Sequence, residues 1–118
     1  MEVTLEANEL VHAVVDIITG KKATNVLILD MHNITLLADY YILCDGSSPR
    51  QIRAISDELL EKLKREGTRL ATTEGTAESG WMLIDLGSVI IHIFSPQQRA
   101  YYQLEELWQN APIMMRML

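Results

Sequence analysis

Residues 81–94 read WMLIDLGSVIIHIF, which is two short apolar runs joined by Gly87 and Ser88. Branched and aromatic residues on both sides of a two-residue, glycine-containing connection are typical of a β-hairpin with a tight turn. The sequence therefore predicts two antiparallel strands, at residues 81–86 and 89–94. Because side chains alternate between the two faces of a strand, each strand separates its residues into two sets.

One face of this hairpin is wholly aliphatic, which predicts that it lies in the core, and the other face is mixed. Exposed apolar surface with aromatic anchors marks protein interfaces, so we expect the mixed face to point outward and to bind a protein partner. Alternatively, a helix covers this face and its residues belong to the core. The predicted partner-binding residues are Trp81, Leu83, Asp85, Ile90, His92 and Phe94.

The segments on either side of the hairpin predict a sheet flanked by helices. Apolar residues at helical spacing mark the helices, and short apolar runs rich in branched residues mark the strands. Ser48 suits the N-cap of the second helix, and Pro49 suits its first position. This order predicts an α/β fold with a mixed β-sheet. The expected elements are helices at residues 6–19, 50–65 and 96–108, strands at residues 25–30, 36–44 and 68–73, and a polar loop at residues 74–80.

The chain length of 118 residues suits one domain with its own core. The sequence contains no repeat, linker or low-complexity tract that would divide it. We expect the domain at residues 1–110. Residues 111–118, APIMMRML, are expected to form a short C-terminal tail that packs on a partner or frays.

The composition limits the classes of partner. The formal net charge of −6 repels phosphate, which disfavours direct binding of nucleic acid and favours a basic protein partner. No apolar run approaches the roughly 20 residues that span a bilayer, and the acidic start of the chain does not resemble a targeting peptide. The single cysteine, Cys44, cannot form an internal disulfide, so a reducing cytoplasm is expected.

One pattern points to an enzyme instead of a binding protein. Gly46 and Ser47 follow a predicted strand and precede a helix, where backbone amides can hold phosphate, and Asp85 ends a later strand. A nucleotidyltransferase needs two or three carboxylates for its metal ions, but position 83 is leucine. We therefore favour a turn and cap at Gly46 and Ser47.

Asp85 and His92 could also pair across the hairpin. Three scattered histidines and one cysteine do not predict a zinc site, and no cofactor is expected.

Two long stretches carry a resemblance to a known family. They are residues 38–59, ADYYILCDGSSPRQIRAISDEL, and residues 74–108, EGTAESGWMLIDLGSVIIHIFSPQQRAYYQLEELW. Both resemble the signature segments of the ribosomal silencing factors, the RsfS/Iojap family. With the first helix and the NVLILD strand, the resemblance covers nearly the whole chain, and it ends near Asn110.

The resemblance implies a single domain similar to the nucleotidyltransferase fold, but without catalysis. It also implies binding to the large ribosomal subunit through its protein L fourteen, a steric block to joining of the small subunit, repression of translation when nutrients are limited, and a homodimer. Two other readings stay open. One is a minimal metal-dependent nucleotidyltransferase that uses Gly46, Ser47 and Asp85. The other is a dimeric adaptor unrelated to ribosomes.

Overall fold

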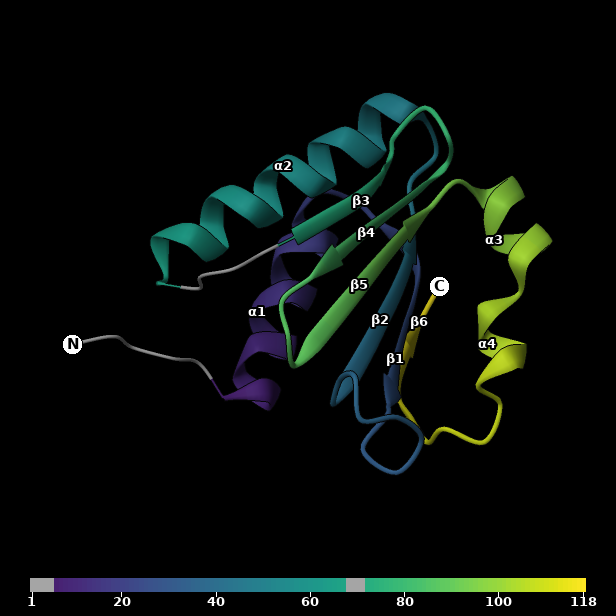
Figure 1. Cartoon of the computed structure of the whole chain (residues 1–118). Helices are drawn as coiled ribbons and strands as arrows, with labels where there is room; N and C mark the ends of the chain where they lie inside the picture. Colours follow the sequence, from purple (N-terminus) through teal and green to yellow (C-terminus); the bar gives the residue numbers. More distant parts are fainter. Residues whose placement is uncertain (1–5, 68–71) are drawn as a thin grey trace.

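A six-stranded mixed sheet forms the centre of the protein (Figure 1). The computed structural model describes residues 6–67 and 72–118. Across the described residues the strand order is β3-β4-β5-β2-β1-β6, with β2 and β5 parallel and each other neighbouring pair antiparallel. The strands are β1 (Thr24–Asp30), β2 (Tyr40–Asp45), β3 (Thr72–Thr76), β4 (Trp81–Asp85), β5 (Val89–Phe94) and β6 (Ile113–Met117). The predicted mixed sheet flanked by helices is confirmed.

Helices cover both faces of the sheet. The long helices α1 (Ala7–Gly20) and α2 (Pro49–Arg65) pack on one face, and the short helices α3 (Pro96–Tyr102) and α4 (Leu104–Leu107) lie over the other (Figure 1). No helix in the described ranges is both long and apolar enough to cross a bilayer.

The alternation of side chains along the central strands creates two cores. On β5, Val89, Ile91 and Ile93 join the core beneath α1 and α2, whereas Ile90 and Phe94 join the core on the α3–α4 side. All six residues of β5 and all six of β2 are buried. A strand buried on both faces leaves no free surface, so only strands nearer the sheet edges can present side chains to a partner.

The start of α2 agrees with its sequence. The Ser48 hydroxyl accepts a hydrogen bond from the Gln51 backbone N–H at 3.1 Å, and Pro49 occupies the first turn. The cap satisfies one of the backbone donors that every helix start leaves without an intrahelical partner. Both predicted roles are confirmed.

The second strand is shorter than predicted. It begins at Tyr40, which pairs with Asp30 at the end of β1, so residues 31–39 are used to reverse the chain. Leu36 and Leu37 are exposed in this connection. Apolar residues in a row are typical of a strand, which explains the prediction. The pairing of β2 with β1 begins only at Tyr40, so these two residues lie outside the ladder.

The last predicted helix is broken. Gln103 adopts a left-handed conformation with φ 49°, which ends α3 and separates it from α4. The chain turns there, so the two short helices follow the curved face of the sheet in place of one straight rod (Figure 1).

Both ends of the sheet also differ from the expectation. Residues 74–76, expected in a loop, belong to β3, while residues 68–71 of the predicted strand lie outside the described ranges. Residues 113–117 of the expected tail form β6, which pairs with β1 in an antiparallel ladder. The C-terminal segment therefore completes the sheet instead of fraying.

Candidate protein-interaction site

The mixed face of the hairpin is divided between core and surface. On β5, Ile90, His92 and Phe94 are only 8%, 4% and 0% exposed. On β4, the side chains of Trp81, Leu83 and Asp85 are half-buried. The expectation that all six point outward is corrected for the β5 residues, because β5 is a central strand and α3 and α4 fold over this face. The sheet still brings all six together, but only the β4 residues reach the surface.

Trp81 is held in one orientation by its neighbours. Its indole Nε1–H donates a hydrogen bond to His92 Nδ1 at 3.2 Å, and its ring stacks on Phe94 with centroids 5.1 Å apart. The ladder supports this stacking, because Trp81 is the register partner of Phe94. A large aromatic side chain that is already ordered loses little entropy when a partner covers it.

His92 is a neutral member of this cluster. Burial and, to a smaller extent, the positive charge of Arg99 together lower its pKa to about 4. Because Nδ1 accepts the indole hydrogen bond, the ring proton resides on Nε2. Within the described residues Nε2 has no hydrogen-bond partner. The rings of Tyr41 and Trp108 lie beside the imidazole, with centroids 5.4 and 6.1 Å away.

A surface pocket of about 280 Å³ lies next to Trp81. Tyr102, at the end of α3, approaches the Trp81 ring to a centroid distance of 4.5 Å and is 45% exposed. Sequence reasoning missed Tyr102, because no local pattern shows that α3 folds back onto β4. The described residues that line the pocket are Glu74, Gly75, Ser79, Trp81, Leu83 and Tyr102.

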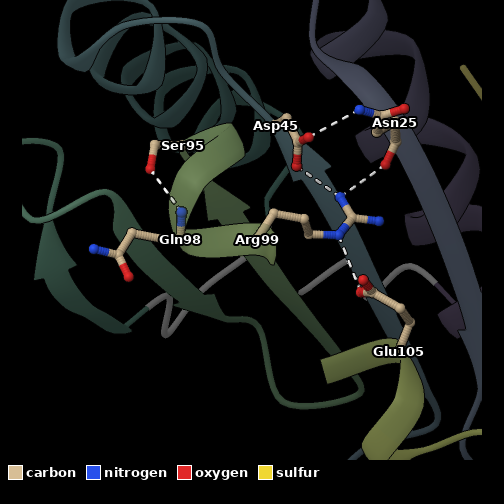
Figure 2. Close-up of polar contacts among 6 residues, drawn as sticks. All are labelled: Asn25, Asp45, Ser95, Gln98, Arg99 and Glu105. Atoms are coloured by element: carbon tan, nitrogen blue, oxygen red, sulfur yellow. Dashed lines mark hydrogen bonds and ion pairs between the residues drawn. The ribbon is translucent and has the colours of Figure 1, made fainter. Parts of the chain in front are cut away.

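A buried ion-pair network attaches α3 and α4 to the sheet (Figure 2). Arg99 Nη1 donates to Asp45 Oδ1 at 2.7 Å and to the Asn25 carbonyl at 2.9 Å, and its Nε donates to Glu105 at 3.0 Å. The side chains of Arg99 and Asp45 are 13% and 3% exposed. This network sets the position of α3 and therefore of Tyr102.

The possible pairing of Asp85 with His92 does not form. Asp85 is opposite Ile90 in the ladder, and its carboxylate accepts a hydrogen bond from the Gly87 N–H at 2.8 Å within the turn. His92 is opposite Leu83. The register therefore places the two groups at different levels of the hairpin.

The polar groups of Ser47 are hydrogen-bonded to a side chain of the protein itself, that of Gln51. The backbone N–H and the hydroxyl of Ser47 both donate to Gln51 Oε1, at 2.6 and 2.8 Å. A Cβ on Gly46 would lie 2.7 Å from Ile52 Cγ1, so close packing of α2 explains the glycine. The turn and cap favoured from the sequence account for both residues.

The residues of the nucleotidyltransferase alternative are not brought together. Gly46 follows the end of β2, at the level of Trp81, whereas Asp85 lies at the other end of β4, at the level of Tyr41. Over the described ranges, no group of three or more histidine, cysteine or acidic side chains is arranged to hold a metal ion. The geometry therefore favours a binding surface over a phosphate site.

Comparison with known proteins identifies the relatives of this chain. A family model described as "Ribosomal silencing factor during starvation" matches residues 4–117. A ribosomal silencing factor RsfS from Halalkalibacterium halodurans is 41% identical over 88% of this chain and 89% of its own length. A crystal structure of a Chromobacterium violaceum protein, 30% identical, superposes with a TM-score of 0.85 over 89% of this chain and 88% of that one. A mouse protein named for mitochondrial assembly of the ribosomal large subunit is 27% identical over 80% of this chain and 42% of its own.

Proposed function

This chain belongs to the ribosomal silencing factor (RsfS) family, and on that premise we propose that it binds the large ribosomal subunit and blocks joining of the small subunit. Repression of translation follows from the block, and the family description, which names starvation, supports nutrient limitation as the condition. The match along residues 4–117 supports a ribosomal role, and the name of the mouse relative supports the large subunit. Such a protein would work in the cytoplasm, where bacterial ribosomes are found.

We propose that the docking surface is centred on Trp81 and includes Leu83 and Tyr102, with protein L fourteen as its partner on the subunit. The observation that carries this assignment is the half-buried Trp81, held rigidly by His92 and Phe94 beside an open pocket. Tryptophan and tyrosine are among the residues that most often dominate the binding free energy of a protein interface. Ile90, His92 and Phe94 support this surface from beneath and do not touch the partner.

The proposed mechanism is steric and needs only affinity and bulk. A domain that occupies the face of the large subunit used for subunit joining prevents the approach of the small subunit. The net charge of −6 assists the encounter with a basic ribosomal protein, because opposite charges accelerate association. No chemical step is required.

A homodimer is also part of the proposal, and the Trp81 surface is a candidate for its interface. One apolar surface cannot bind a second copy and a ribosomal protein at the same time, so dimer formation would compete with docking. Sedimentation equilibrium of the purified protein, with and without large subunits, tests this competition. A dimer that persists on the subunit would contradict a shared surface.

Co-sedimentation with purified ribosomal particles tests the central proposal. The protein should migrate with isolated large subunits, and an excess of it should reduce the joined ribosomes. Absence from the large-subunit fraction would overturn the proposed function.

Trp81→Ala should weaken binding to the large subunit by about 2 kcal/mol or more, because a central aromatic anchor is removed. Leu36→Ala is the control, since Leu36 is fully exposed on the β1–β2 connection. Dissociation constants measured with labelled protein provide the comparison. An equal loss in both variants would contradict the placement of the site.

A further inference from the structure

The pocket beside Trp81 combines one carboxylate with two aromatic rings. Glu74 on β3 is the register partner of Leu83 on β4, and Tyr102 approaches the same place from α3. β3 and β4 are consecutive strands and α3 comes from later in the chain, and each of the three contributes one wall. Of the described residues that line the pocket, Glu74 is the only charged one.

The β3–β4 ladder requires a glycine beside the pocket. Gly75 has a φ of +79°, and a Cβ there would lie 2.1 Å from the Trp81 carbonyl oxygen. The backbone of β3 therefore approaches β4 without a side chain at this point. Any other residue at position 75 would strain the ladder, so this wall of the pocket is formed by backbone.

We propose that this pocket receives an arginine side chain of the partner protein, an inference that rests on the proposed docking function. The guanidinium group lies over the ring of Trp81 or Tyr102 and donates to the Glu74 carboxylate, while its aliphatic stem covers Leu83. Arginine fits better than lysine, because its planar group stacks on aromatic rings and pairs with a carboxylate through two hydrogen bonds.

The charge and size of the pocket favour a single basic side chain over other ligands. An apolar side chain would cover the Glu74 carboxylate without supplying a donor, which is unfavourable. An anion would be repelled by Glu74 and by the net charge of −6. The volume of about 280 Å³ is at the lower limit of small-molecule sites, which suits one side chain.

Titration of the free protein tests the pocket without any ribosome. The probe is Nα-acetyl-arginine N-methylamide, followed by the NMR resonance of the Trp81 indole N–H, which Trp108→Phe distinguishes from the other tryptophan. The resonance should shift to saturation with the arginine compound but not with the neutral citrulline analogue. Glu74→Gln should weaken this binding about fivefold or more, through loss of charge-assisted hydrogen bonds. Equal shifts with both compounds, or none, would overturn the proposal.

Large subunits provide the second test, with a control matched in charge. Glu74→Gln and Glu106→Gln remove the same charge, but Glu106 is exposed on α4 and does not line the pocket. Glu74→Gln should weaken binding about fivefold or more and Glu106→Gln less than about twofold. Tyr102→Leu should also weaken binding, and Tyr102→Phe should restore it. Equal effects of the two glutamate variants would show long-range attraction only and overturn the proposal.

The two tests separate failure of the pocket from failure of the proposed function. If wild-type protein does not bind large subunits, the ribosomal partner is wrong, and the titration still reports whether the pocket selects arginine. If wild-type protein binds subunits but Glu74→Gln leaves both measurements unchanged, the docking function stands and the arginine pocket is wrong.

Discussion

Residues on one face of a hairpin can differ in how far they are buried, as Trp81 and His92 show. They lie on the same face of the hairpin, but His92 is 4% exposed on a central strand and Trp81 is half-buried near the edge. The hydrogen bond between them connects the buried His92 to the partly exposed Trp81. Burial also keeps the imidazole neutral, which preserves its Nδ1 as an acceptor for the indole.

The lowered pKa of His92 predicts a loss of stability in mild acid. Its pKa is about 4 in the folded protein, against 6.5 for an ordinary histidine side chain, so the unfolded chain binds the proton more tightly. The free energy of unfolding should therefore fall by about 3 kcal/mol as pH drops from about 6.5 to 4, with no further contribution from His92 below that range. Urea unfolding of the wild type and His92→Gln at several pH values measures this effect.

His92→Gln is the matched variant, because its amide oxygen can accept from the Trp81 indole but does not titrate. The pKa of His32, which is raised by its hydrogen bond to Asp30, changes stability in the opposite direction, but it does so in both proteins. The difference between the two proteins therefore isolates His92. Parallel pH profiles would contradict the prediction.

Helices α3 and α4 determine which residues of the mixed face of the sheet are exposed. They bury Ile90 and Phe94 and place Tyr102 against Trp81. Neither helix is long enough to be stable alone, so the attachment depends on tertiary contacts. The buried pair of Arg99 and Asp45 is the polar part of that attachment (Figure 2).

Removal of the Asp45 charge should destabilise the protein strongly. Asp45→Asn leaves the Arg99 guanidinium buried without its main counter-charge, which costs about 3 kcal/mol or more. The control is Glu78→Gln, which removes the exposed ion pair between Arg53 and Glu78 and should cost less than about 1 kcal/mol. Urea unfolding of both variants provides the measurement. Similar losses would indicate that the buried network does not hold α3.

The C-terminal segment adds the last strand to the sheet, beside β1. β6 pairs with β1, and Ala111 before it is buried in the α3–α4 core. Met115 packs against the core on the other side. The segment therefore joins both layers, although its sequence reads as a short apolar tail.

Truncation after Asn110 should destabilise the whole domain. The loss of β6 exposes one edge of β1 and opens the core at Ala111, so the free energy of unfolding should fall by more than about 2 kcal/mol. Removal of Leu118 alone is the control, because this residue is 95% exposed. Thermal unfolding followed by circular dichroism compares the proteins. An unchanged midpoint in the longer truncation would show that β6 adds nothing to the fold.

The hairpin, the cap of α2 and the division of the β5 side chains between two faces could be predicted from the amino-acid sequence alone. These features depend on local alternation and on neighbouring residues, which a linear pattern records. The same patterns missed the break at Gln103, which no glycine or proline marks.

Which half of the mixed face is exposed follows from the folded arrangement of the chain and could not be predicted from the sequence pattern. That outcome depends on contacts between residues far apart in the chain, such as Arg99 with Asp45 and Tyr102 with Trp81. Alternation shows that two residues share a face, but it does not show what covers that face. Coverage is a property of how the chain folds back on itself, and here α3 and α4 bury β5 while leaving Trp81 and its pocket open.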